Sequence, residues 1–101
     1  MIKHVKTEAE FNAAIAEGNV LVDFWAIWCG PCMMMGEKIE KEILPALPAL
    51  TVVKVDVDEA PELAAKFGVM SIPALFCFKG GEKVAGYVGV TDTEELKHVF
   101  S

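Results

Sequence analysis

The chain has 101 residues, of which 53% are hydrophobic, and its formal net charge is −6. This length fits one ordinary domain, so we expect residues 1–101 to form a single domain. The acidic balance argues against nucleic acid as a partner, because phosphate binders concentrate Lys and Arg on one face. No stretch reaches the ~18 uncharged apolar residues of a membrane helix, and the N-terminal residues lack the apolar centre of a signal peptide. We therefore expect a cytoplasmic protein that binds neither membranes nor nucleic acid.

The first third of the chain predicts a strand, a helix and a second strand. A short strand over Ile2–Val5 precedes a helix, which Thr7 and Glu10 begin as a capping box and Gly18 ends. The next segment, Asn19–Ala26, is an almost continuous apolar and β-branched run. Such a run is typical of a central strand that is buried on both faces.

The middle of the chain continues this alternation. After Pro31, apolar residues recur at three- and four-residue spacing, which predicts a helix that ends near Leu44, before two prolines. Leu50–Val57 predicts another buried strand. A short helix is expected between Pro61, which suits a first helical turn, and Gly68, which suits a terminator.

The last third predicts a hairpin and a final helix. Ala74–Lys79 and Glu82–Val88 are separated by two glycines, which is a strong signal for a tight turn. Thr91 and Glu94 have the spacing of a capping box that begins the last helix. Strands that alternate with helices indicate an α/β fold, and we expect a central mixed five-stranded sheet flanked by about four helices.

Two of the three cysteines form the motif Cys29-Gly30-Pro31-Cys32, at the start of a predicted helix. Cysteines at this spacing can close a small disulfide ring. A thiolate is the attacking form, and a helix N-terminus favours an anion, so Cys29 is the predicted nucleophile. Cys32, one turn further in, would resolve the mixed disulfide with a substrate. The remaining cysteine, Cys77, is expected to pack as a small apolar residue.

A static disulfide and half of a zinc site are the structural alternatives for this pair. A static disulfide is not expected in a chain without a secretion signal. Zinc needs about four ligands, and the sequence contains no second C-x-x-C motif and no paired histidines. We therefore expect no metal. The common phosphate-binding glycine loops are also missing from the sequence, so no bound cofactor is expected.

The segment VDFWAIWCGPC closely resembles the thioredoxin family, and the resemblance covers nearly the whole chain. It includes Asp23, Trp25, Trp28, Lys54, Ile72-Pro73, Gly81 and Gly89, in the family's order and spacing. The resemblance implies the thioredoxin fold, with three parallel strands followed by an antiparallel hairpin. It also implies a monomeric protein disulfide reductase that acts on disulfide-containing proteins. A flavin-containing, NADPH-dependent thioredoxin reductase would recycle it.

Asp23 lies within the apolar run VLVDFWA, where a carboxylate is costly to bury and should have a raised pKa. The alternative is a carboxylate at a strand end that reaches water. The resemblance implies that Asp23 accepts the proton of Cys32. It also places Lys54 beside Asp23, where the lysine would tune the carboxylate. By itself, Lys54 is equally consistent with an exposed strand lysine next to Asp56.

The resemblance further implies a cis bond between Ile72 and Pro73, facing the two cysteines. The residues expected to bind an extended substrate segment are Trp28, Gly30, Pro31, Ile72, Pro73, Gly89 and Val90. Core packing or turn formation is the alternative role for each of them. For Trp25, core packing is the preferred interpretation.

The chain departs from the family after the second cysteine, where a basic residue is usual and Met33 stands instead, followed by Met34 and Met35. Losing this charge could raise the pKa of Cys29, and it makes the rim of the site more apolar. Two other functions stay open: a thiol oxidase or isomerase of the same fold, and a non-catalytic docking subunit. The Gly30-Pro31 dipeptide favours the reductase, whereas the methionine run gives modest support to docking.

Overall fold

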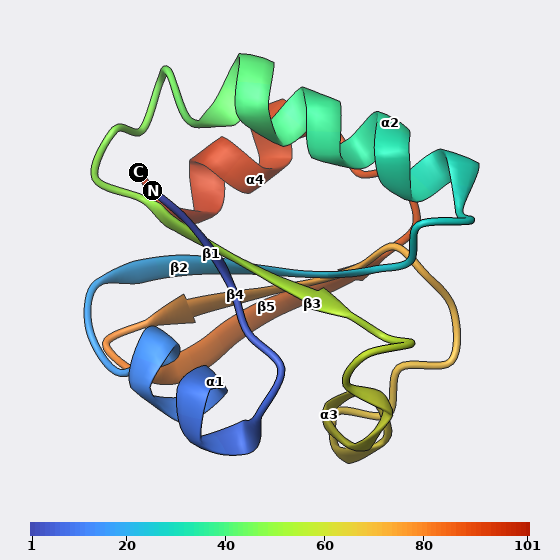
Figure 1. Cartoon of the computed structure of the whole chain (residues 1–101). Helices are drawn as coiled ribbons and strands as arrows, with labels where there is room; N and C mark the ends of the chain where they lie inside the picture. The colour runs from blue at the N-terminus through green and yellow to red at the C-terminus, as the bar shows by residue number, and fades with distance from the viewer.

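Strands and helices alternate along residues 1–101, all of which are described by a computed structural model (Figure 1). In chain order the elements are β1 (Ile2–His4), α1 (Glu8–Ile15), β2 (Asn19–Trp25), α2 (Gly30–Lys38), the π-helical segment η1 (Ile39–Ile43), β3 (Thr51–Asp56), α3 (Pro61–Lys66), β4 (Ala74–Lys79), β5 (Glu82–Val88) and α4 (Thr93–Val99). The hairpin strands have the predicted bounds, while β1, β2 and β3 are shorter than predicted by one residue at one or both ends. No helix has the length and apolar character needed to cross a membrane.

The five strands form one mixed sheet in the order β1-β3-β2-β4-β5. β3 pairs in parallel with both β1 and β2, whereas β4 is antiparallel to β2 and to β5. Helices α2 and α4 cover one face of the sheet and α1 and α3 cover the other (Figure 1). The predicted five-stranded mixed sheet with four helices is confirmed.

The central strand β2 separates two apolar layers. Because side chains alternate along a strand, Val20, Val22 and Phe24 join the cluster under α1 and α3, whereas Leu21 joins the cluster under α2 and α4. By the same alternation, Asp23 faces α2. The sheet therefore presents a carboxylate to the helix that begins with the two cysteines.

Helix α2 begins at Gly30, with Cys29 as its N-cap and Pro31 in its first turn. Its buried face repeats at helical spacing, as predicted, and continues through η1: Cys32, Met35, Gly36, Ile39 and Ile43. The last turn widens, and the backbone N–H of Leu44 donates to the carbonyl oxygen of Ile39 at 3.0 Å. The helical run thus ends where the sequence predicted, just before Pro45.

The predicted capping box of Thr91 and Glu94 is wrong. The N-cap of α4 is Asp92, whose Oδ1 accepts a hydrogen bond from the backbone N–H of Glu94 at 3.0 Å. The Thr91 hydroxyl instead donates to the carbonyl oxygen of Gly89 at 3.0 Å. Aspartate caps a helix at least as well as threonine, and Thr91 is already engaged in the turn that follows β5.

We expect Asp92→Ala to lower the free energy of unfolding by about 1 kcal/mol, because it leaves a backbone N–H of the first turn of α4 without its acceptor. Asp92→Asn is the matched control, since its amide oxygen still accepts that bond. Urea unfolding followed by circular dichroism measures both variants. Equal losses for the two variants would show that the charge of Asp92, and not its capping bond, stabilises α4.

Candidate active site

Cys29 and Cys32 are joined as a disulfide, with their Cα atoms 5.2 Å apart. This separation is within the usual range for a disulfide. The backbone N–H of Cys32 donates to the sulfur of Cys29 at 3.2 Å, so the side chain of the N-cap residue Cys29 caps α2 through its sulfur. Partial positive charge at a helix N-terminus stabilises a negatively charged sulfur at this place. The position therefore favours the thiolate form of Cys29 after the disulfide is reduced.

The two cysteines differ in how far they reach the surface. The exposed fraction is 6% for Cys29 and 1% for Cys32. Both residues are buried, and Cys29 is the less enclosed of the two. Accessibility and the helix N-terminus therefore both favour Cys29 as the attacking atom.

Segments from distant parts of the chain meet at Cys29. Its sulfur lies 3.9 Å from the carbonyl oxygen of Ile72, and the Ile72–Pro73 peptide bond is cis, as expected. The backbone N–H of Gly89 donates to the carbonyl oxygen of Pro73 at 2.7 Å. Gly89 has a φ of +87°, a conformation that favours glycine. The structure thus brings the cysteine, the cis-proline loop and the turn after β5 together.

The other predicted substrate-binding residues surround this point. Gly30 and Pro31 are exposed in the first turn of α2, Trp28 is 68% exposed, and Val90 is exposed beyond Gly89. Ile72 is half-buried, and Pro73 is buried beneath the surface. All seven predicted positions therefore lie at or near the end of the molecule where α2 begins.

Asp58 is a residue that sequence reasoning missed. Its Oδ2 accepts a hydrogen bond from the indole N–H of Trp28 at 2.8 Å, and its own backbone N–H donates to Oδ1 of Asp56 at 2.9 Å. Asp58 thus orients an exposed tryptophan beside the disulfide. No signal in the sequence links Trp28 with Asp58, which are separated by 30 positions.

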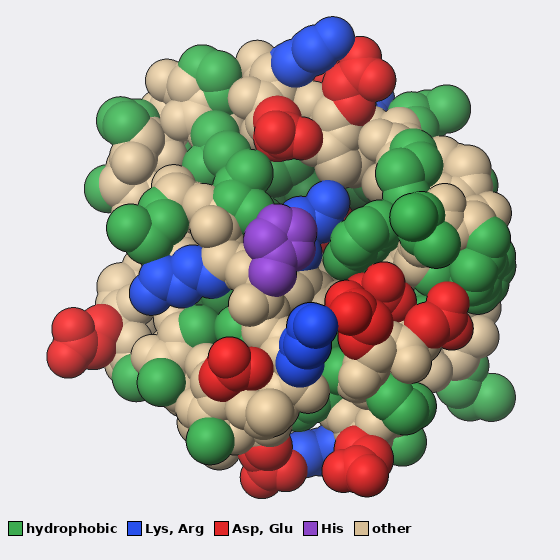
Figure 2. Space-filling model, viewed as in Figure 1, with side chains coloured by type: hydrophobic (Ala, Val, Ile, Leu, Met, Phe, Trp, Pro, Cys, Tyr) green, Lys and Arg blue, Asp and Glu red, His purple; other side chains and the backbone are tan.

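Hydrophobic side chains remain exposed on this end of the molecule. Figure 2 shows a hydrophobic surface on the right, which is the side where α2 begins and α3 lies in Figure 1. The exposed large hydrophobic residues near the cysteines in sequence are Ile27, Trp28, Met33 and Met34, and Met70 is exposed before the cis-proline loop. Met35 is fully buried, as expected for a core position. The predicted apolar rim is present.

Asp23 is fully buried, and neither carboxylate oxygen has a hydrogen-bond partner. Burial raises the pKa of Asp23 from 3.8 to about 6, while the nearby positive charge of Lys54 acts in the opposite direction. The predicted raised pKa is confirmed, and the alternative of a strand-end carboxylate exposed to bulk water is excluded. A carboxyl group with this pKa can exchange a proton near neutral pH.

Lys54 is the direct neighbour of Asp23 across the parallel pair β2–β3, so the two side chains lie on the same face of the sheet. The Lys54 ammonium also lies 4.6 Å from the centre of the Trp25 ring, a cation–π contact. Trp25 is half-buried and packs against the cluster of Ala26, Cys29 and Cys32. Lys54 therefore lies beside Asp23 and is partly buried, and it is not a freely exposed strand lysine.

Cys77 lies apart from these groups. It is fully buried on β4, within the apolar layer under α2 and α4. Burial raises the pKa of its thiol to about 11. The thiol form is unreactive, so Cys77 has the core role that its apolar neighbours predicted.

Comparison with known proteins agrees with this geometry. The sequence matches the family described as Thioredoxin over residues 2–101. It is 46% identical over 101 residues to a thioredoxin of Listeria monocytogenes, covering 100% of this chain and 97% of that one. This chain belongs to the thioredoxin family. A thioredoxin of Bacillus subtilis is 46% identical over 95 residues, which cover 94% of this chain and 91% of the relative.

Solved structures extend the likeness from sequence to fold. A mutant thioredoxin from Halobacterium salinarum NRC-1 superposes with a TM-score of 0.87 at 36% identity, covering 98% of this chain and 87% of that one. Mitochondrial thioredoxin 3 of Saccharomyces cerevisiae, in its oxidised form, has a TM-score of 0.87 at 31% identity, with coverage of 98% and 92%. The protein is accordingly a thioredoxin-type protein disulfide reductase, and Cys29 and Cys32 form its redox-active pair.

Proposed function

We propose that Cys29 attacks and Cys32 resolves during reduction of a protein disulfide. The Cys29 thiolate displaces one substrate sulfur, which leaves as a thiolate and takes a proton from solvent. The Cys32 thiolate then attacks the sulfur of Cys29 and releases the second substrate sulfur. Two electrons pass to the substrate, and the Cys29–Cys32 disulfide remains. The position of Cys29 as the N-cap of α2, where it is less deeply buried than Cys32, is the observation that carries this assignment.

Asp23 is the proposed acceptor of the Cys32 proton. Cys32 is buried, so its thiol needs a base inside the protein before it attacks. Asp23 faces the same helix, has no hydrogen-bond partner, and has a pKa of about 6. A base with a pKa near the working pH combines a useful ionised fraction with enough basicity. Lys54 tunes this carboxylate from the neighbouring strand.

The proposed substrate surface consists of Trp28, Gly30, Pro31, Ile72, Pro73, Gly89 and Val90. An extended segment of a disulfide-containing protein would lie across Ile72 and Pro73 and place its disulfide beside Cys29. The hydrogen bond between Gly89 and Pro73 supports this arrangement, because it holds two sides of the surface together. The exposed apolar rim favours substrate segments with apolar side chains.

A thioredoxin reductase is the proposed source of electrons, since the oxidised pair must be reduced before each new cycle. We propose that the protein acts in the cytoplasm, where such a reductant is available. The monomer is the proposed working form, and we propose that the chain uses no cofactor of its own.

The reduction potential of the Cys29–Cys32 pair tests the direction of this reaction. We expect roughly −220 mV or lower, which is the range of the cytosolic glutathione poise. Equilibration with a glutathione buffer measures it, with Cys77→Ala in the background to remove side reactions. A potential nearer to about −120 mV would instead assign the protein to the thiol oxidases.

A further inference from the structure

A small chamber lies between α2 and the sheet, next to Asp23. The centre of a water molecule could occupy a volume of about 10 Å³ in this chamber. This volume is close to the minimum that one water molecule needs. Three of its lining residues carry charged groups, namely Asp23, Glu40 and Lys54, and the others are Ile2, Gly36, Ile39 and Val52. The chamber is therefore just large enough for one water, and three of its lining residues carry groups that could bind it.

This chamber adjoins a wider cavity of about 440 Å³ that opens toward solvent. The two spaces share Gly36, Glu40 and Lys54, and the wider one is also lined by Cys32. A Cβ atom at Gly36 would lie 3.4 Å from the Lys54 nitrogen, so the ammonium lies against the part of α2 that has no side chain. Gly36, Glu40 and Lys54 thus lie between the chamber beside Asp23 and the cavity that opens toward solvent.

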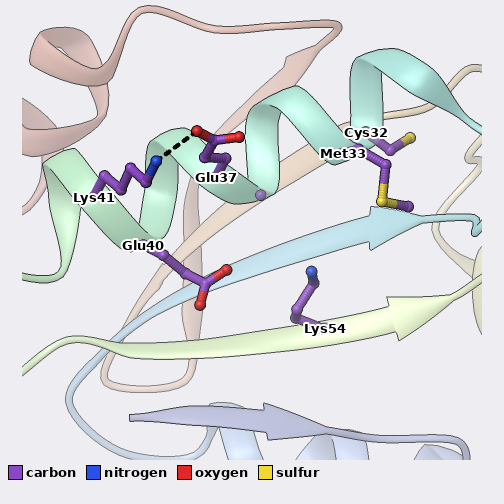
Figure 3. Close-up of a pocket in the computed structure, with 7 residues that line it drawn as sticks. Cys32, Met33, Glu37, Glu40, Lys41 and Lys54 are labelled. Carbon is purple, nitrogen blue, oxygen red and sulfur yellow. Dashed lines mark hydrogen bonds and ion pairs between the residues drawn. The ribbon is translucent and has the colours of Figure 1, made fainter.

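Figure 3 shows the carboxylate of Glu40 and the ammonium of Lys54 directed into the same space between the helix and β3. Glu37 also lines the wider cavity, but its carboxylate pairs with Lys41 at 2.7 Å and it does not line the inner chamber. Of the acidic residues on this helical run, Glu40 alone shares the chamber with Asp23.

The unpartnered carboxylate of Asp23 supplies the reason for a water there. A buried carboxylate without hydrogen bonds is costly, and both oxygens of Asp23 lack a protein partner. A water in the chamber would have Asp23, Lys54 and Glu40 as partners, which is the number that a buried water usually has. It would also connect the buried carboxylate to solvent.

We propose that Glu40 is a positioning residue of the reductase, which together with Lys54 holds a water against Asp23 and so completes the proton route from Cys32 to solvent. This inference rests on the proposed role of Asp23 as proton acceptor. The Cys32 thiol gives its proton to the Asp23 carboxylate, Asp23 returns the proton to the water, and the water passes one to bulk solvent by way of Glu40. No electrons move in these transfers.

The charges around Asp23 predict the direction of the effect. Lys54 faces Asp23 from β3 and Glu40 faces it from η1, while His4 on β1 is the register partner of Lys54. A negative charge on Glu40, at the edge of the same chamber, would oppose ionisation of Asp23. Glu40→Gln should therefore favour the ionised form of Asp23.

The test compares Glu40→Gln with Glu37→Gln, which changes the net charge equally but lies outside the chamber. The titration of Asp23 is followed by NMR of its carboxyl carbon in the oxidised protein. The rate of resolution in a single turnover with a disulfide peptide is measured from pH 5 to pH 9. We expect Glu40→Gln to raise the acid dissociation constant of Asp23 roughly three-fold, as a nearby screened charge does. It should also lower the rate of resolution at its high-pH plateau.

Glu37→Gln should leave both quantities unchanged, and Glu40→Asp, which keeps the charge, should restore most of the wild-type behaviour. Identical profiles for Glu40→Gln and Glu37→Gln would overturn the role of Glu40. Asp23→Asn separates this failure from that of the proposed function. If Asp23→Asn leaves the pH–rate profile unchanged, the proton acceptor itself has been misassigned. If Asp23→Asn abolishes the midpoint of the pH–rate profile while Glu40→Gln behaves like Glu37→Gln, only the assignment of Glu40 fails.

Discussion

Serine in place of Cys29 is expected to lower the rate of disulfide reduction on the order of 10³-fold or more. A serine hydroxyl is not ionised at neutral pH, and it cannot form the mixed disulfide on which the reaction depends. The assay is reduction of a disulfide-bonded protein such as insulin, with a chemical reductant in excess. Cys77→Ala is the matched control, since it removes a buried cysteine outside the active site, and it should retain turnover.

Cys32→Ser should give a different defect. Cys29 can still attack, but no second thiol releases the substrate, so a stable mixed disulfide accumulates. Mass spectrometry under non-reducing conditions detects it as an adduct on Cys29. An adduct on Cys32 in the Cys29→Ser protein, with none on Cys29 in the Cys32→Ser protein, would reverse the two assigned roles.

The double variant Cys29→Ser with Cys32→Ser separates catalysis from docking. A reductase loses all function with both sulfurs. A subunit that acts through its exposed rim of Ile27, Met33 and Met34 would keep its function without them. Retained function in the double variant would therefore favour the docking alternative.

Asp23→Asn is expected to stabilise the protein at pH 8 by about 3 kcal/mol and to slow the resolving step. The pKa of Asp23 is about 6 in the folded protein and 3.8 as the ordinary value. Each unit of difference is worth about 1.4 kcal/mol. Because the folded state holds this proton more tightly than the unfolded state, ionisation costs stability as the pH rises.

The contribution of Asp23 to the stability of the fold depends on pH. The contribution of Asp23 is fully present below pH 4, falls as the pH rises through about 6, and is lost above it. Asn stays neutral, so the two proteins should have similar stability at pH 4 and diverge toward pH 8. Urea unfolding across this range measures the difference. Glu82→Gln, at an exposed position on β5, is the control for a change of net charge.

A difference between Asp23→Asn and wild type that does not vary with pH would contradict this account. It would mean that the Asp23 carboxyl has the same pKa in the folded and unfolded states. The proposed role of Asp23 in proton transfer would account for a carboxylate that is costly to bury. Stability and resolution rate should therefore change in opposite directions in this variant.

Local signals in the sequence were sufficient to predict the order of the strands and helices. The two glycines between Ala74–Lys79 and Glu82–Val88 predicted the bounds of the hairpin, since a tight turn depends on neighbouring residues alone. The C-x-x-C motif likewise predicted the disulfide, because both cysteines lie within one helical turn. The cap of α4 was misassigned because Thr91 and Asp92 are both good capping residues. The hydrogen bond of Thr91 within the turn after β5 decided between them.

By itself, then, the sequence determined the order of strands and helices, the redox pair and the costly position of Asp23. The resemblance to a family added the cis bond at Pro73 and the place of Lys54. The tertiary structure confirmed Lys54 beside Asp23 through parallel strand register, and it alone showed that Asp58 meets Trp28 and that Glu40 lies at the chamber. The physical reason is that helix and turn signals act over a few residues, whereas these contacts join segments brought together only by packing of the sheet and its helices.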